Sequence, residues 1–393
     1  MRDKTNTIIF RDSLCRLLQS VLFDGIRIDL SPDQRAEAFR TAHEQKVVPL
    51  AYAGAKDAAE LKNEFYASVV SFYRLLSVQT LLTDVLTAEG ITPVILKGTA
   101  AGIYYPHPEY RTYGDIDFFV KPEDFERALA ILGQNDFRVA QTVRPEDRHV
   151  VMLKNGVTLE LHRYWCGLDQ WNSPLHGEEM NARIFSAQPV QAELDGQRFF
   201  MLPTAENGLV LLTHINNHIA HGIGLRQVLD WMMFVKENLT DAYWQAEFGP
   251  LAKRYGLDRL AVILSHMCQM YLGLEGREWY SRADEKICAE LMDYILASGN
   301  FGEIQSRETD THIKGTLLSR STVKGFFGHL HRSGLRQWKA AQEHKFLRPF
   351  AGLYCAGHYV SQILRRKDGM QRMKNAFTDA AKHRKLMRAI RPR

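Results

Sequence analysis

The chain of 393 residues has few cysteines, and they are not paired at short spacing. None stands in a CxxC pair, and the five are scattered along the chain: Cys15, Cys166, Cys268, Cys288 and Cys355. Disulfide frameworks and thiolate zinc sites both need paired or clustered cysteines, so the pattern argues against either. We therefore expect a protein that works in a reducing compartment.

Long apolar runs are also missing. No segment reaches the ~18 consecutive apolar residues that a membrane helix needs. Charges interrupt the N-terminal sequence MRDKTNTIIFRDSLCRLLQ, where a signal peptide would have an apolar core. No low-complexity tract is present, and 24% charged with 45% hydrophobic residues is typical of a globular protein. The sequence therefore predicts a cytoplasmic protein of two or three domains.

Acidic residues are scarce in the last fifth of the chain. Residues 313–393 hold 19 Lys and Arg and three acids, a net charge of +16, whereas residues 1–312 have a net charge of −11. Such an excess indicates an anionic partner. Three interpretations stay open: a solvated helix without a ligand, binding to RNA or another polyanion, and binding to an anionic membrane surface. The last is suggested by apolar anchors before the charges: Phe346, Phe350, Leu353, Tyr354 and Tyr359. No feature indicates an obligate protein partner.

Hydrophobic periodicity predicts an α+β protein in four regions. These are a helical N-terminal region at 1–90, a small mixed core at 91–165, a helical C-terminal domain at 166–312 and a basic, aromatic-rich tail region at 313–393. Alternating and short apolar runs predict a core sheet of about five strands. They lie at 92–97, 115–120, 137–142, 149–153 and 157–162, and the last two are joined by an Asn-Gly turn.

Three acidic residues of this core are candidates for a metal site. Side chains two apart on a strand share a face, so Asp115 and Asp117 project together. Two adjacent carboxylates repel each other unless a cation lies between them, and oxygen ligands suit Mg²⁺. If the strand at 157–162 pairs beside them, Glu160 supplies a third carboxylate, with His162 on the same face. Three acids on adjacent strands can hold one or two Mg²⁺ ions, the arrangement used for transfer at phosphorus.

A phosphate-binding turn is predicted beside these acids. Lys97-Gly98-Thr99 lies where a strand enters a helix, and glycine allows the backbone to approach a phosphate. Lys97 and Arg111 are candidates to neutralise the rest of a triphosphate. The alternative for Arg111 is a structural pair with a loop carboxylate.

Together these motifs resemble the uncharacterised nucleotidyltransferase family of the polymerase-β-type superfamily. The resemblance is carried by LKGTAAGIYYPHPEYRTYGDIDFFV, by VTLELH and by HINNHIAHGIGLRQVLDW. It implies catalytic, metal-binding roles for Asp115, Asp117 and Glu160, and transfer of a nucleoside monophosphate from an NTP such as ATP to an acceptor, for which a small molecule is expected. Lys97-Gly98 departs from the usual Gly-Ser of the superfamily. Two alternatives therefore stay open: a nucleotide-binding module without turnover, and an adaptor that acts through the basic tail.

Histidines also form a stripe on the predicted helix at 204–221. His214, His218 and His221 are spaced i, i+4 and i+7 and so share one helix face. A transition-metal site, the lining of an acceptor cleft and simple packing are all compatible with that spacing. We expect His162, His214 and His218 to line the acceptor cleft. On the following helix, Arg226 and Asp230 are expected to form an i, i+4 ion pair.

Overall fold

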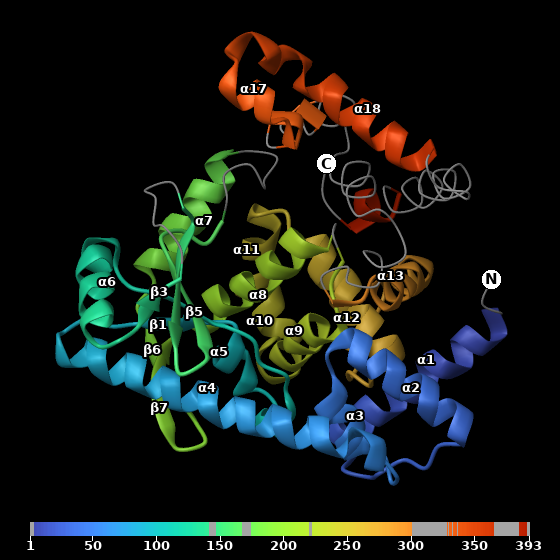
Figure 1. Ribbon diagram of the computed structural model, residues 1–393. Helices are drawn as coiled ribbons and strands as arrows, with labels where there is room; N and C mark the ends of the chain where they lie inside the picture. Colours follow the sequence, from blue (N-terminus) through green and yellow to red (C-terminus); the bar gives the residue numbers. More distant parts are fainter. Residues whose placement is uncertain are drawn as a thin grey trace.

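A computed structural model describes residues 4–140, 147–166, 174–219, 222–300, 328, 330–331, 333–335, 337–364 and 385–390 (Figure 1). Most of the basic residues behind the polyanion prediction lie outside the described residues, at 301–327, 365–384 and 391–393. His221 lies outside them too.

Within the described residues, seven strands form one mixed sheet in the order β3-β4-β5-β2-β1-β7-β6. β2 runs parallel to β5 and β1 runs parallel to β7, while the other neighbours are antiparallel. Helices cover the sheet, so the predicted α+β class is confirmed. The strands are β1 (Val94–Leu96), β2 (Ile116–Phe119), β3 (Arg138–Val139), β4 (His149–Lys154), β5 (Val157–His162), β6 (Val190–Leu194) and β7 (Gln197–Met201).

The hairpin of β6 and β7 lies beyond the five strands expected from the sequence. Most of β6 is exposed, so it has no continuous apolar run to reveal it. Its turn, Asp195-Gly196, has φ values of 49° and 75°, as a two-residue hairpin loop requires. The predicted Asn155-Gly156 turn between β4 and β5 has nearly the same values, 50° and 76°. The sheet therefore continues past residue 165.

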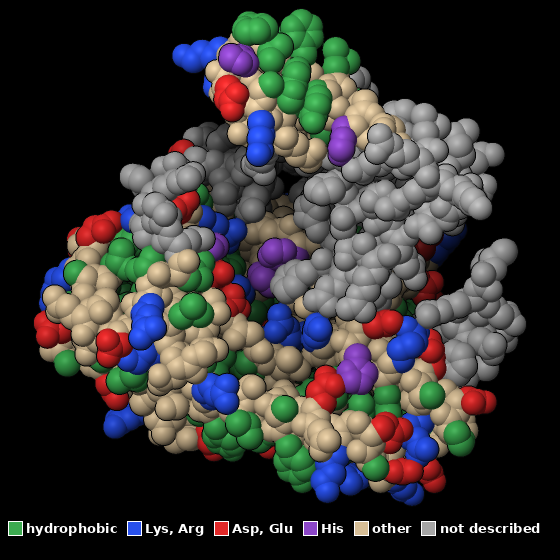
Figure 2. All heavy atoms as spheres, viewed as in Figure 1, with side chains coloured by type: hydrophobic (Ala, Val, Ile, Leu, Met, Phe, Trp, Pro, Cys, Tyr) green, Lys and Arg blue, Asp and Glu red, His purple; other side chains and the backbone are tan. Residues whose placement is uncertain are grey.

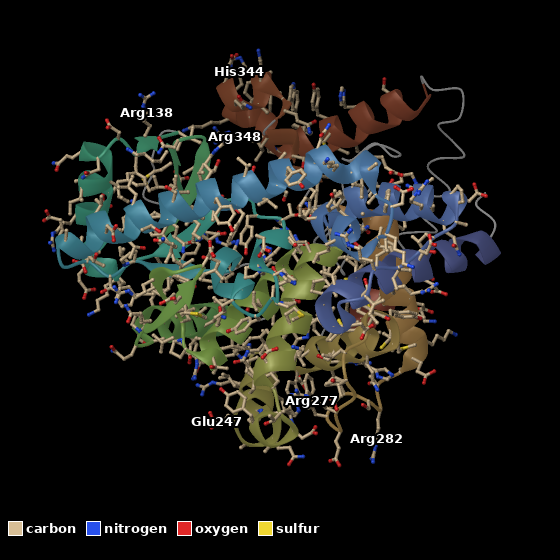
Figure 3. The ribbon with its side chains drawn as sticks, turned by 90° about the horizontal axis from the view of Figure 1, so that it is seen from below. Arg138, Glu247, Arg277, Arg282, His344 and Arg348 are labelled. Atoms are coloured by element: carbon tan, nitrogen blue, oxygen red, sulfur yellow. The ribbon has the colours of Figure 1, made fainter. Side chains whose placement is uncertain are left out.

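One face of the sheet is covered by α4 (Lys62–Ala88) and α6 (Phe125–Gln134). Figure 3 shows α4 lying across the near side of the molecule. Its buried residues repeat at helical spacing and pack with Ile95, Phe118 and Leu161 of the strands; they include Phe72, Leu75, Leu76, Leu82 and Leu86. The helix stops at Gly90, whose φ is 74°.

By length and composition alone, the segment Ala59–Ala88 around α4 is the one described helix that is apolar enough to cross a membrane. Its most apolar window is 44% buried inside the structure. Packing on the sheet explains the buried side of α4, while Tyr66, Val70, Tyr73 and Leu81 on the same helix are exposed.

The opposite face meets the helices of both flanking regions. One hydrophobic core joins Leu96 of β1, Leu17 of the N-terminal helices, and Leu212 and Trp231 of the later helices. The N-terminal helices α1 to α3 thus share a core with residues after 200, while α4 belongs with the sheet. The principal helices of this layer are α1 (Lys4–Gln19), α2 (Pro32–Gln45), α3 (Val48–Gly54), α7 (Pro174–Ser186), α8 (Thr204–His218), α9 (Leu225–Asn238), α11 (Gly249–Arg254), α12 (Asp258–Leu272) and α13 (Glu285–Ser298).

The described part of the basic tail region is helical. It comprises α17 (Lys339–Glu343), the 3₁₀ segment η8 (Lys345–Phe350) and α18 (Ala351–Leu364). Phe346, Phe350 and Leu353 expose 72%, 54% and 73% of their surface, and Tyr354 is also exposed. Large apolar side chains therefore face outward in this part of the tail region.

Candidate active site

The three predicted acids come together at the centre of the sheet. β2 and β5 are parallel neighbours, and Asp117 lies directly opposite Glu160. Asp115 is two residues earlier, in the loop that enters β2, so its side chain projects on the same side as that of Asp117. One oxygen of each carboxylate lies within 4.8 Å of the other two. We call Asp115, Asp117 and Glu160 the acid cluster.

The charges of the acid cluster are only partly compensated. Asp117 is buried, and its two oxygens meet Lys97 Nζ at 2.7 Å and His162 Nε2 at 2.9 Å. Burial opposes ionisation, but the Lys97 ammonium and the His162 hydrogen bond hold the pKa of Asp117 well below its usual range. Burial, and then the charges of Asp117 and Asp115, raise the pKa of Glu160 to about 7. A cation at the Glu160 end would relieve this repulsion.

The turn from β1 into α5 (Gly98–Gly102) brings Lys97 to the acids. Lys97 and Gly98 have φ values of 52° and 39°, a conformation that is least costly for glycine. The Thr99 side chain faces the core: its hydroxyl donates to Gln79 Oε1 at 2.6 Å and is buried. The predicted nucleotide-binding role of Thr99, as part of a turn that offers backbone N–H groups, stays a prediction.

Arg111 is engaged in a buried ion pair. Its Nε and Nη2 donate to the two oxygens of Asp230 on α9, at 2.7 and 2.8 Å, and the hydroxyl of Tyr105 donates to the same carboxylate at 2.9 Å. Arg111 is 5% exposed. Asp230 neutralises this guanidinium, and the predicted phosphate contact of Arg111 stays a prediction. Among the described residues Asp230 forms no ion pair with Arg226, so that predicted pair is wrong. The alternative of a structural pair holds, with a helix carboxylate as partner.

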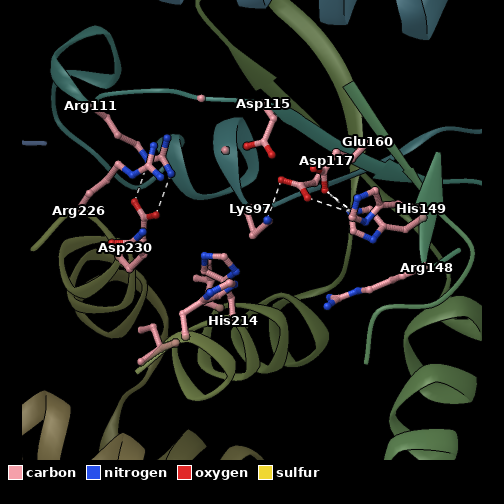
Figure 4. A pocket seen from close by; sticks show the side chains of 17 residues that line it. Lys97, Arg111, Asp115, Asp117, Arg148, His149, Glu160, His214, Arg226 and Asp230 are labelled. Carbon is pink, nitrogen blue, oxygen red and sulfur yellow. Dashed lines mark hydrogen bonds and ion pairs between the residues drawn. The ribbon is translucent and has the colours of Figure 1, made fainter. Parts of the chain in front are cut away.

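A pocket of about 290 Å³ lies between the acid cluster and the helices α8 and α9 (Figure 4). Figure 2 shows histidine side chains gathered in a hollow of the molecular surface, between acidic and basic side chains. The predicted residues that line the pocket are Lys97, Gly98, Arg111, the acid cluster, His162, His214 and His218. His214 and His218 are in ring contact, with centroids 4.6 Å apart. Burial and then Lys97 lower the pKa of His214 well below its usual value, so its ring is neutral.

The lining residues that the sequence did not assign to the site include Arg148, His149 and Arg226. The guanidinium of Arg148 lies 5.3 Å from the Trp165 ring centroid. Arg226 donates through Nη1 to the carbonyl of Thr112 at 3.4 Å. Within the described residues, the Nε atoms of both arginines lack a hydrogen-bond partner, and no ion pair links either to an acid. These two cations are therefore available to an anionic ligand.

Comparison with known proteins identifies the family of the chain. A search of curated proteins finds no match. The structure is similar to that of the antibiotic-resistance factor ANT(2'')-Ia (14% identity, TM-score 0.33, 46% of this chain and 94% of that one). It is also similar to an antigenic nucleotidyltransferase-like protein from Paracoccidioides brasiliensis (13% identity, TM-score 0.32, 52% and 94%). The profile of the family described as uncharacterised nucleotidyltransferase matches residues 31–273, more than half of the chain. The chain belongs to this family, as its motifs predicted, and is a nucleotidyltransferase.

Proposed function

We propose that this enzyme transfers a nucleoside monophosphate from an NTP, with Mg²⁺, to a hydroxyl or amine of a small molecule. The observation that carries the proposal is the acid cluster, three carboxylates from two adjacent strands whose oxygens lie within 4.8 Å of one another. In the reaction the acceptor oxygen or nitrogen loses its proton and bonds to the α-phosphorus. The bond from that phosphorus to the bridging oxygen breaks, and pyrophosphate leaves.

The residues present fit Mg²⁺. Asp115, Asp117 and Glu160 offer only oxygen ligands, and burial followed by the charges of Asp117 and Asp115 raises the pKa of Glu160. When bound there, one or two Mg²⁺ ions would polarise the phosphate and stabilise the charge of the attacking and leaving oxygens. The protein holds these carboxylates in place through the register of β2 and β5.

Four residues support binding of the triphosphate: Lys97, Gly98, Arg148 and Arg226. Gly98 has no side chain to keep the backbone away from a phosphate, and an added Cβ would meet nothing closer than the Asp115 carbonyl at 3.9 Å. Among the residues that the structure describes, Arg148 and Arg226 of the pocket lining form no ion pair with an acid. Guanidinium groups can bind phosphate oxygens with two parallel hydrogen bonds.

The volume and the far wall of the pocket support a small acceptor. About 290 Å³ is at the lower end of the range of ligand sites, which is roughly 300–1,000 Å³. Opposite the acids, α8 contributes Leu211 and Ile215 together with His214 and His218. This wall combines apolar surface with imidazole groups that can hydrogen-bond a hydroxyl or an amine.

The proposal is tested with NTPs labelled at the α-phosphate. The full-length protein is incubated with each NTP, Mg²⁺ and a panel of small hydroxyl and amine compounds, and both pyrophosphate and labelled adducts are measured. We expect transfer to at least one class of acceptor, with loss of the activity in EDTA. NTP binding without pyrophosphate release under any condition would instead favour the nucleotide-binding module without turnover.

Replacing Lys97 with Met is expected to weaken NTP binding about 10-fold to 100-fold, since a hydrogen bond to a charged group contributes about 1.5–3 kcal/mol. Calorimetric titration with a non-hydrolysable NTP measures the effect. In the absence of nucleotide the same variant should bind Mn²⁺ more tightly, because Lys97 no longer occupies an oxygen of Asp117.

The matched control is Lys121→Met, on an exposed loop outside the pocket, which should leave both affinities unchanged. If NTP binding to Lys97→Met equalled that of the wild type, the role of Lys97 would be confined to the ion pair with Asp117.

A second proposal concerns the tail region and the location of the enzyme: a cytoplasmic protein that attaches peripherally to an anionic membrane surface. Phe346, Phe350 and Leu353 are exposed beside Lys345 and Arg348 of η8. Figure 3 shows His344 and Arg348 at the edge of the molecule. Apolar side chains among basic ones match the requirements of interfacial binding, in which apolar burial adds to electrostatic attraction.

Vesicle co-sedimentation tests this second proposal. We expect binding to vesicles that contain anionic lipid, weakening steeply between about 50 and 200 mM salt. Substituting Phe346, Phe350 and Leu353 together with Ser should reduce binding at least about 10-fold, because each apolar side chain contributes ~1.5–3 kcal/mol when buried. Binding to RNA that resists this triple substitution, without binding to vesicles, would assign the tail to a nucleic acid.

A further inference from the structure

Three side chains beside the acid cluster form a second group of metal-ligand type. His149 of β4 lies opposite His162 of β5, and Glu160 is two residues before His162 on the same strand. All three therefore project from one face of the sheet. One ligand atom of each lies within 4.8 Å of the other two. Figure 4 shows His149 and Glu160 together at one end of the pocket.

The spacing of these atoms is too wide for good hydrogen bonds. His149 Nδ1 is 3.5 Å and His162 Nε2 is 3.6 Å from Glu160 Oε2. Among the described residues His149 Nδ1 is buried without a hydrogen-bond partner. Leaving such an atom unsatisfied costs ~1–3 kcal/mol. Two ligand atoms that each lie about 2.0–2.1 Å from a tetrahedral zinc ion are roughly 3.4 Å apart. The observed distances match that requirement.

The donor chemistry differs from that of the acid cluster. Two imidazole nitrogens and one carboxylate suit Zn²⁺ and related transition metals, and a set of two histidines and one glutamate leaves a position open for a further ligand. Magnesium prefers oxygen ligands alone. An imidazole ring without a net charge has one ring nitrogen with a free lone pair, which it can offer to such an ion.

We propose that His149, Glu160 and His162 form a binding site for Zn²⁺ or a similar transition-metal ion. Binding through His162 Nε2 needs the tautomer that carries its proton on Nδ1, so the proton moves from Nε2 to Nδ1 and the hydrogen bond from Nε2 to Asp117 is lost. The nearby positive charges of Lys97 and Arg148 disfavour binding of the metal ion, whereas the negative charge of Asp117 favours it. The site shares Glu160 with the acid cluster, so Zn²⁺ withdraws that carboxylate from Mg²⁺ and inhibits transfer. This inhibition, unlike the site itself, rests on the proposed function.

Calorimetric titration of Zn²⁺ into the metal-stripped, full-length protein tests the site without nucleotide. His149→Ala should weaken Zn²⁺ binding at least about 100-fold, since even a hydrogen-bond partner of a ligand is worth 10–100-fold. Asp115→Asn, which removes a nearby charge but no zinc ligand, should weaken Zn²⁺ binding far less than His149→Ala does. His107→Ala, at an exposed histidine outside the pocket, is the control for adventitious binding. Equal affinities of wild type and His149→Ala, or a larger loss in Asp115→Asn, would overturn the proposal.

The visible spectrum of Co²⁺ bound to the wild-type protein gives a test that needs no variant. Four-coordinate Co²⁺ with nitrogen ligands absorbs far more strongly than the six-coordinate ion on oxygen ligands. We expect the strong spectrum, lost on addition of one equivalent of Zn²⁺, and a weak six-coordinate spectrum alone would refute the site. Because neither titration involves an NTP, an enzyme inactive in transfer can still confirm the site, and absence of the site leaves magnesium-dependent transfer intact.

Discussion

Replacing Asp117 with Asn is expected to lower the rate of nucleotidyl transfer at least about 1,000-fold, which corresponds to a barrier higher by ~4 kcal/mol. Asp117 is the central acid of the cluster, opposite Glu160 in the parallel register and next to Asp115. An amide has the same shape but offers one neutral oxygen, so it binds a divalent cation poorly. Single-turnover transfer of labelled nucleotide measures the loss, and Mn²⁺ titration without nucleotide should show weaker binding.

The matched control is Asp195→Asn, which makes the same chemical change in an exposed hairpin turn. Asn tolerates the left-handed conformation of that position, so neither folding nor transfer should change. Thermal unfolding of both variants separates loss of chemistry from loss of structure. If both Asp117→Asn and Asp115→Asn kept the wild-type rate of transfer to an identified acceptor, the acid cluster would have no catalytic role.

The acids were predictable from the sequence because strand geometry fixes which side chains share a face. The alternation around Asp115 and Asp117, and around Glu160, determines their direction whatever the neighbours are. His149 could also have been found. A two-residue loop at Asn155-Gly156 sets the register of its hairpin, and counting outward from that loop places His149 opposite His162, as observed. By contrast, no local sequence pattern predicts that β2 and β5 are neighbours in the sheet.

The arginines were not predictable from local spacing. Arg226 and Asp230 are four residues apart on α9, a spacing that favours an ion pair, but Asp230 binds Arg111, which is 119 residues away in the sequence. The long-range pair prevails because Arg111 reaches both carboxylate oxygens with parallel hydrogen bonds and Tyr105 adds a third. Only the packing of the loop 103–114 against α9 creates that geometry.

Two neighbouring arginines should consequently respond in opposite ways to the same substitution. Arg111→Met leaves the buried carboxylate of Asp230 without its cation, and we expect a loss of ~3–5 kcal/mol in the free energy of unfolding. Binding of NTP to the folded variant should stay within about threefold of wild type. Arg226→Met removes a cation that has no acidic partner among the described residues, so stability should change by less than about 1 kcal/mol. NTP binding should weaken about 10-fold or more.

The double variant Arg111→Met with Asp230→Leu completes the second prediction. Each single substitution leaves one buried charge uncompensated, whereas the double substitution removes both charges, so its loss should be smaller than the sum of the two. We expect a coupling free energy of ~2–3 kcal/mol from unfolding of the four proteins in denaturant. If the losses of unfolding free energy were additive, the contact of Arg111 with Asp230 would not be what holds the loop to α9. If Arg111→Met also bound NTP more weakly, Arg111 would be shown to contact the nucleotide. A coupled loss with unchanged NTP affinity assigns Arg111 to the structure of the pocket wall and leaves Arg226 as the arginine that meets the phosphates.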